Sequence, residues 1–229
     1  MLKVILVSCA SLVVLSLSMI SLVNGQVLDK VYAPNTKPFG LTYGQWSEKW
    51  WQWSLSIPLA DNPGGDDTGE KCNGGQSDMN VWYLSGTFGG PVVRNCKIPE
   101  GKAIFFPVVN SECSYLEFPA YKTEAELRKC AVTFADKVSN LDASVDGIKI
   151  PDIQKYRFQS GLFNFSLPAE NVLGLAPGMT DSVADGYWIM LKPLAKGEHT
   201  IQFGGSVVDV SITSSINFAT QATYHITVE

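Results

Sequence analysis

Glu112 is the acidic residue whose position in the sequence best suits chemistry. It follows the apolar run "KAIFFPVVN", residues 102–110, which is typical of a strand buried on both faces. A carboxyl group at the end of such a strand can have a raised pKa and act as a general acid or base. A polysaccharide hydrolase would need a second carboxylate across a cleft, and Glu48 and Asp67 are the candidates. We favour the structural alternative, in which Glu112 accepts backbone hydrogen bonds at the strand end.

A second group of acidic residues lies in "DNPGGDDTGEKCNGGQSD", residues 61–78, whose composition is typical of a loop. The side chains that could bind a metal there are Asp61, Asp66, Asp67 and Glu70. Carboxylate oxygens on a flexible backbone suit calcium, although the spacing does not match an EF-hand. We favour the alternative that these are solvated loop charges, and we expect neither a metal nor a cofactor.

Sequence motifs of common catalytic machinery are absent. The two histidines, His199 and His225, lie in strand-like segments without a neighbouring nucleophile motif. The chain contains neither the G-x-S-x-G pattern of serine hydrolases nor the H-E-x-x-H pattern of zinc proteases. The sequence therefore favours a protein that is not an enzyme.

The segment "YGQWSEKWWQW", residues 43–53, places four tryptophans in eight positions. Thr42 and Gln45 form a capping box and a proline follows Ile57, so the pattern predicts a helix over residues 43–56. One face of this helix carries Tyr43, Trp46, Trp50 and Trp53. Three buried indoles remove ~600 Å² from water, and a patch of that size is rarely left exposed on a monomer. We expect this face to anchor the helix to a sheet.

Trp51 points away from that face, and Ser47 and Ser54 separate it from the main stripe. A helix can bury both faces only if it lies in a groove, which small serine side chains would permit. We favour burial of Trp51 in such a second interface, because tryptophan is usually largely buried. The alternative is an exposed Trp51 that serves as a stacking platform for a sugar ring.

The first 25 residues have the composition of a secretory signal peptide. Lys3 is their only charge, an apolar run covers residues 4–23, and small residues follow it. We expect cleavage after Gly25, with an uncleaved membrane anchor and a lipoprotein signal at Cys9 as alternatives. The remainder, residues 26–229, is predicted to be a single domain.

Four cysteines follow the predicted signal peptide, namely Cys72, Cys96, Cys113 and Cys130. An even number in an exported chain indicates two disulfides, for which three pairings are possible. The absence of a C-x-x-C pair disfavours zinc sites and thioredoxin-like chemistry. We expect the pairs Cys72–Cys96 and Cys113–Cys130, because each closes a local loop.

The rest of the chain predicts a second helix and many strands. Thr123 and Glu126 form another capping box, which predicts a helix over residues 124–138. From about residue 141, strand-like segments follow at short intervals with turn residues between them. The sequence therefore predicts a mainly β (α+β) fold, an antiparallel β-sandwich of jelly-roll or Ig-like type with two helices packed on it.

Two hairpins are predicted within this sandwich. Segments 81–86 and 91–96 are strand-like and are separated by a Gly-rich turn. Asp146 and Gly147 form a two-residue hairpin signal between two further short strands.

Several segments resemble those of a known family of exported proteins, found mainly in prokaryotes and without an assigned activity. They are "YGQWSEKWWQWSLSIP", "WYLSGTFGG", "R.C.IP.GKAIFFPVVNSECS" and the late "GEHTIQFGG", together with a "NP…D.TG..C" pattern. The resemblance covers most of the chain after residue 25. It implies export and a shared fold, and it transfers no catalytic residue.

Charge and hydropathy narrow the classes of partner. The net charge is −5 and no basic block occurs, which disfavours nucleic acid. No apolar segment after the first approaches the length that spans a membrane. We expect a secreted, extracellular, periplasmic or envelope-associated protein that binds glycan or another surface polymer. The alternatives are a carboxylate-dependent polysaccharide hydrolase and a purely structural extracellular component.

Overall fold

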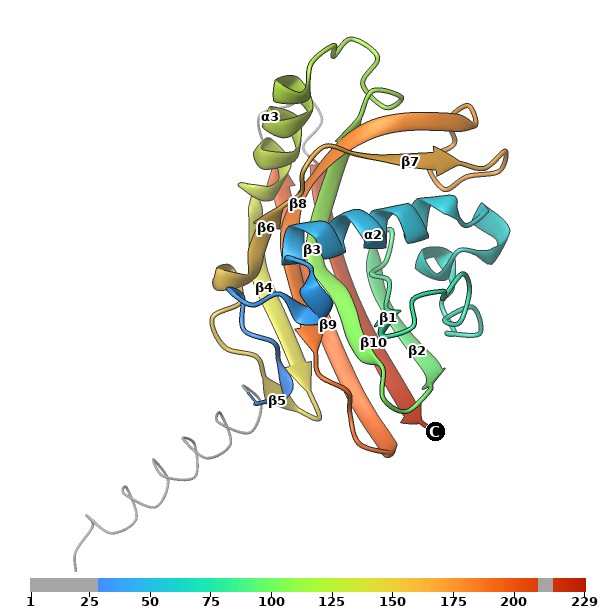
Figure 1. The fold of residues 1–229 in the computed structure, drawn as a ribbon, viewed down its shortest axis with the longest axis vertical. Helices are drawn as coiled ribbons and strands as arrows, with labels where there is room; N and C mark the ends of the chain where they lie inside the picture. Colours follow the sequence, from blue (N-terminus) through green and yellow to red (C-terminus); the bar gives the residue numbers. More distant parts are fainter. Residues whose placement is uncertain (1–28, 210–215) are drawn as a thin grey trace, which may run out of the picture.

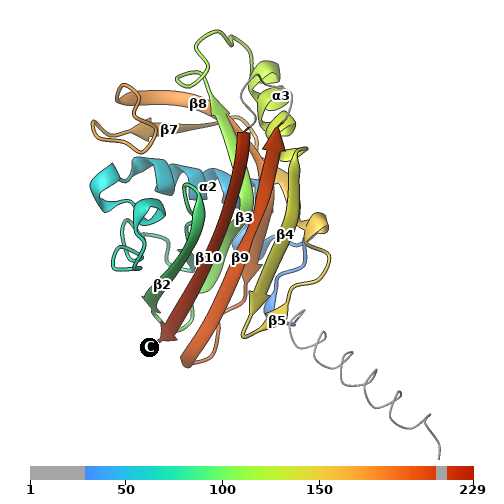
Figure 2. The same cartoon turned by 180° about the vertical axis from the view of Figure 1, so that it is seen from behind.

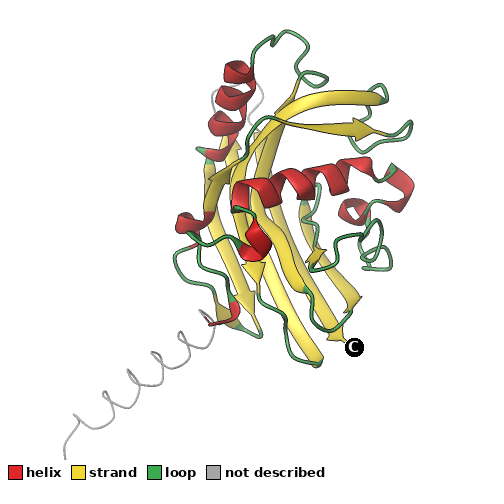
Figure 3. Ribbon diagram, in the orientation of Figure 1, coloured by secondary structure: helices red, strands yellow, loops and turns green. Residues whose placement is uncertain are grey.

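Within residues 29–209 and 216–229, which the structure describes, two five-stranded β-sheets pack face to face (Figure 1). The structure is a computed structural model. Helix α2 (Tyr43–Ser56) crosses the outer face of the first sheet, and α3 (Glu124–Ala135) packs at one end (Figure 3). The predicted signal peptide, residues 1–25, lies outside the described residues.

The first sheet has the order β1–β3–β8–β6, with β7 also paired to β8. Its strands are β1 (Val81–Tyr83), β3 (Ala103–Ser114), β6 (Arg157–Gln159), β7 (Phe163–Leu167) and β8 (Gly178–Leu191). Short 3-10 helices lie in the connections, namely η1 (Pro38–Gly40), η2 (Leu59–Asp61), η3 (Pro63–Gly65) and η4 (Ile153–Tyr156).

The second sheet has the order β2–β10–β9–β4–β5. Its strands are β2 (Gly90–Ile98), β4 (Val138–Val145), β5 (Ile148–Lys149), β9 (Gly197–Asp209) and β10 (Ile216–Val228). Seen from behind, this sheet presents a face that no helix of the described residues covers (Figure 2).

The predicted sandwich with two helices is confirmed, but its sheets are mixed rather than wholly antiparallel. β1 runs parallel to β3, and β2 runs parallel to β10. The hairpin predicted over residues 81–86 and 91–96 is therefore wrong, because its two strands belong to different sheets. The hairpin at Asp146 and Gly147 is confirmed, since β4 pairs with β5 and both turn residues have positive φ, 53° and 76°.

Arg94 connects the segment that follows β1 in the first sheet to strands of the second sheet. Its side chain is buried and donates to the carbonyl oxygens of Ser85 at 2.9 Å and Gly86 at 2.8 Å. The same guanidinium donates to the Tyr224 hydroxyl at 2.7 Å, and that hydroxyl donates to Ser85 O at 2.8 Å. These bonds tie the segment that follows β1 to strands β2 and β10 of the second sheet.

Helix α2 begins and ends as predicted. The Thr42 side chain accepts from the Gln45 amide at 3.2 Å, and the Gln45 side chain accepts from the Thr42 amide at 3.0 Å. The side chains of Trp46, Trp50 and Trp53 are 1%, 4% and 6% exposed, so the predicted anchoring face is confirmed.

Each of the three buried indoles also satisfies its N–H group. Trp46 donates to Pro38 O at 3.0 Å, Trp50 to Leu84 O at 2.9 Å and Trp53 to Gly74 O at 2.9 Å. A buried indole N–H without such an acceptor would destabilise the folded state, because the group loses its hydrogen bond to water on burial. The helix is therefore fixed by apolar area and by directional bonds together.

The sheet surface beneath α2 is aromatic. Phe105 of β3 and Trp188 of β8 are stacked with ring centroids 5.2 Å apart, and Trp50 meets Trp188 edge-on at 5.4 Å. On the opposite face of β3, Phe106 stacks on Phe203 of the second sheet at 4.5 Å. β3 is thus buried on both faces, as its continuous apolar sequence predicts.

Helix α3 begins at the predicted capping box but ends earlier than expected. It stops at Ala135, and Val138 is instead the first residue of β4, where it pairs with Val207 of β9. Both predicted disulfides are confirmed, Cys72–Cys96 and Cys113–Cys130. The second of these joins the end of β3 to α3.

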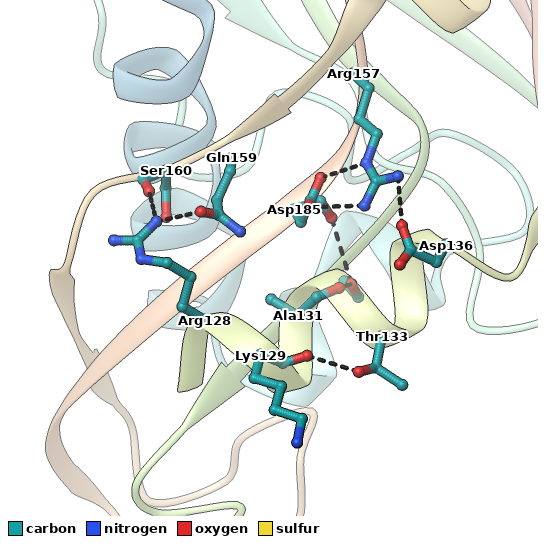
Figure 4. A network of polar contacts seen from close by, with 10 residues as sticks. Arg128, Lys129, Ala131, Thr133, Asp136, Arg157, Gln159, Ser160 and Asp185 are labelled. Atoms are coloured by element: carbon teal, nitrogen blue, oxygen red, sulfur yellow. Dashed lines mark hydrogen bonds and ion pairs between the residues drawn. The ribbon is translucent and has the colours of Figure 1, made fainter. Parts of the chain in front are cut away.

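A polar network links α3, β6 and β8 (Figure 4). Arg157 Nε and Nη2 donate to the two carboxylate oxygens of Asp185, each at 3.0 Å, and Nη1 donates to Asp136 at 2.7 Å. Asp185 is 3% exposed. Arg128, in the same network, donates to Gln159, to Ser160 O and to the exposed Glu124.

Trp46→Ala should lower the free energy of unfolding by about 3–5 kcal/mol, because it removes a buried indole together with its hydrogen bond to Pro38 O. Lys49→Ala is the matched control, since Lys49 is exposed on the same helix and should change stability by less than ~0.5 kcal/mol. Urea denaturation measures both. Equal effects of the two substitutions would contradict the anchoring role of the tryptophan face.

Arg157→Met should lower the free energy of unfolding by about 3–5 kcal/mol, because it leaves the buried Asp185 carboxylate unpaired. Arg128→Met should cost about 1 kcal/mol or less, since its ion pair with Glu124 is exposed. Thermal and chemical denaturation of the two variants compare these contributions. If Arg128→Met lowered the free energy of unfolding as much as Arg157→Met, the expectation would be wrong.

Candidate functional site

A cavity of about 350 Å³ lies beside α2 and the end of β3, and we refer to it as the Trp51 pocket. Its aromatic lining residues are Trp50, Trp51, Phe88, Phe118, Phe134 and Phe218. A few polar side chains also reach it, among them Asn110, Glu112 and Glu117. Small-molecule sites typically occupy ~300–1,000 Å³ and combine an apolar lining with a few convergent polar groups.

A second hollow, of about 400 Å³, is lined by residues of β2, β4, β9 and β10. Asp142 is the only charged side chain among its described lining residues, and its one aromatic residue, Phe203, is 2% exposed. It therefore has neither an accessible aromatic surface nor a group of side chains suited to chemistry. The Trp51 pocket has both.

Strand pairing places Glu112 at the pocket. It is at the end of β3, opposite Ala184 of β8, and its side chain is only 8% exposed. The hydroxyl of Ser182 on β8 lies against the Glu112 carboxyl group and can donate to it or to Cys113 O, 3.0 Å away. Glu112 is thus held by side-chain contacts rather than by backbone amides.

Glu117 brings a second carboxyl group into hydrogen-bonding contact with that of Glu112. It lies in the turn after β3, where the Ser114 hydroxyl donates to its carboxylate at 2.8 Å. The backbone amide of Glu117 donates in return to Ser114 Oγ at 3.4 Å. The turn therefore fixes Glu117 toward the strand end that carries Glu112.

Burial raises the pKa of Glu112 well above the usual value of 4.5. The hydrogen bond and the negative charge of Glu117 raise this pKa further, while the Ser182 hydroxyl lowers it. The pair therefore retains one proton over a pH range in which two separate carboxyl groups would both be ionised.

Two buried hydrogen-bond donors in the pocket lining have no partner in the described part of the chain. They are Nε1 of Trp51 and Nδ2 of Asn110. Unsatisfied buried donors cost about 1–3 kcal/mol each, so natural proteins rarely retain them without a reason. Nε1 of Trp82 and Nε1 of Trp188, outside the pocket lining, are likewise buried and without a partner in the described residues, so unpartnered donors do not by themselves mark the pocket as a site.

Trp51 lies where α2 meets a second apolar cluster. It is half-buried and packs both on the main core and on the cluster of Leu55, Phe163, Phe165, Leu167 and Ala184. Its ring meets that of Trp50 edge-on at 5.0 Å. The helix therefore lies in a groove, and Trp51 combines an interface role with a place in the pocket lining.

The two residues named as partner carboxylates for Glu112 lie elsewhere. The Glu48 carboxylate accepts from the Gly161 amide at 2.9 Å, and Glu48 is not among the pocket lining residues. Asp67 is exposed in the loop after η3. Sequence reasoning missed Glu117, although its spacing from Ser114 has the same Ser/Thr-x-x-Glu form as the capping box of α3.

The four candidate calcium ligands do not form a common group. Asp66 is buried, and its carboxylate accepts from Thr68 N at 2.9 Å and Lys71 N at 2.8 Å. Burial alone would raise the pKa of Asp66, but these backbone hydrogen bonds outweigh it and lower that pKa. Asp61, Asp67 and Glu70 are exposed. Among the described residues, no three acidic, His or Cys side chains form a group that could hold a metal ion.

No model of a known protein family matches the chain, and no curated protein sequence matches it either. In the described part of the chain, no helix has both the length and the apolar character needed to cross a membrane. The site must therefore be interpreted from its own geometry.

Glu112→Gln should make the stability of the protein less dependent on pH. Because the pKa of Glu112 is higher in the folded state, its favourable contribution is complete below the unfolded pKa of about 4.5 and is lost as pH rises through the folded pKa. The variant should therefore gain stability relative to the parent as pH increases from 4.5 toward neutral.

Urea denaturation across this pH range measures the difference. Glu48→Gln is the control, because Glu48 lies outside the pocket and should leave the pH dependence of the parent unchanged. The assignment would be wrong if Glu112→Gln and the parent lost stability in parallel as pH rises.

Proposed function

We propose that this chain is an exported, non-enzymatic binding protein whose ligand is a glycan or another surface polymer. The composition of residues 1–25 supports export through a secretory signal peptide. The two disulfides are consistent with this, because disulfides persist in oxidising compartments. An extracellular, periplasmic or envelope location follows from the proposal, and the resemblance to a family of exported proteins agrees with it.

The observation that carries the proposal is the composition of the Trp51 pocket. An aromatic lining suits the apolar face of a sugar ring, and side-chain donors and acceptors suit its hydroxyl groups.

The arrangement of the two carboxyl groups favours binding over glycoside hydrolysis. Retaining glycosidases separate their two carboxyl groups by ~5–5.5 Å and inverting enzymes by ~6.5–9.5 Å. Glu112 and Glu117 are instead in hydrogen-bonding contact, which leaves no space between them for a scissile bond.

An array of immobilised glycans, probed with the oxidised protein, tests this function. Binding should be measurable for at least one glycan class, and Trp51→Ala should weaken it roughly tenfold, which corresponds to about 1.4 kcal/mol. Lys49→Ala, on the exposed face of the same helix, should bind like the parent.

Release of reducing sugar is measured in parallel. We expect none from the parent protein. Sugar release that Glu112→Gln abolishes would replace the proposal with hydrolysis, and the absence of both binding and release would leave a structural role.

A further inference from the structure

We propose that the glycan recognised by the Trp51 pocket contains an amino sugar with a free, protonated amine. This inference rests on the proposed glycan-binding function and specifies the class of sugar. It is carried by the charge of the pocket and by its aromatic lining, which match the amine and the C–H face of such a ring.

The first feature is a negative charge without a counter-ion. Glu112 and Glu117 are the only titratable side chains among the described residues that line the pocket, and no lysine, arginine or histidine accompanies them. Their carboxyl groups contact each other and the hydroxyls of Ser114 and Ser182. An ammonium group placed there would gain a charge-assisted hydrogen bond in a partly desolvated site.

The second feature is the aromatic lining around this charge. Trp50 and Trp51 come from α2, and Phe118 and Phe134 come from the loop after β3 and from α3. Aromatic faces attract cations by about 0.5–2 kcal/mol when the cation is partly desolvated. The same rings pack against the C–H face of a pyranose, so one lining can hold both the ring and its amine.

Binding of an amino sugar should also change the protonation of the carboxyl pair. Because the pKa of Glu112 is raised, the pair retains one proton over a pH range above the usual carboxyl pKa of 4.5. Within that range, and at a pH low enough for the amine of the free ligand to be fully protonated, the bound ammonium group stabilises the ionised form of the pair, so the proton should be released to solvent. A neutral sugar in the same position would not cause this release.

Titration calorimetry with three matched ligands tests the inference. They are a short linear oligomer of glucosamine, its N-acetylated counterpart and the corresponding oligomer of glucose, which share a ring but differ in charge. The glucosamine oligomer should bind at least tenfold more tightly than either of the others. Titrations in two buffers of different ionisation enthalpy should detect proton release for the glucosamine oligomer alone.

Glu117→Gln keeps the shape of the side chain and should reduce the preference for the glucosamine oligomer to less than twofold. Glu48→Gln removes a carboxylate outside the pocket and should retain the full preference. Circular dichroism and the thermal midpoint check that each variant is folded. If Glu117→Gln fails to fold, proton release by the parent protein still tests the inference.

The outcomes separate the inference from the function on which it rests. Equal affinity for the glucosamine and glucose oligomers would overturn the inference and leave glycan binding intact. Failure of all three oligomers to bind would overturn the inference, and the proposed function would fall with it only if no glycan on the array bound either. Binding of tetramethylammonium without binding of any sugar would also overturn the inference, because the site would then recognise a cation alone.

Discussion

Burial of the tryptophan face of α2 against β3 and β8 is the interaction on which the rest of the structure depends. Trp46 and Trp50 contact a surface of Phe105 and Trp188, and their N–H groups bond to backbone oxygens outside the helix. The first sheet is thereby covered on one side by the helix and on the other by the second sheet. This covering explains why β3 can be apolar at nearly every position.

The same interaction sets the position of the Trp51 pocket. Once Trp50 is fixed against Trp188, the next residue, Trp51, must project sideways from the sheet toward the end of β3. There it lines a cavity shared with Glu112, whose burial opposes ionisation. A cavity with an aromatic lining and a buried carboxyl pair is a candidate binding site.

Sequence reasoning succeeded where the physics acts over a few residues. The two capping boxes, the turn at Asp146 and Gly147, and the local disulfide loops all follow from hydrogen bonds or chain closure over short separations. The burial of the tryptophan face followed from helical periodicity alone. These features do not require knowledge of which strands are neighbours.

The failures concern long-range partners. Two strand-like segments on either side of a Gly-rich turn look like a hairpin, but they pair with β3 and with β10, which belong to different sheets. Arg94 holds the connection between them through Ser85 O and Gly86 O. The sequence identified Glu112 as a candidate but not its partner, Glu117. The contact between the two carboxyl groups depends on how the turn after β3 folds back on the end of that strand. The pocket is a product of that assembly.

The disulfide between Cys113 and Cys130 gives this pocket a dependence on compartment. Cys113 directly follows Glu112, and the stretch that it closes with Cys130 contains Glu117 and Phe118. In a reducing compartment this segment would be held to α3 by non-covalent contacts alone, whereas the disulfide locks it in place. The shape of the cavity is therefore coupled to the redox state of its surroundings.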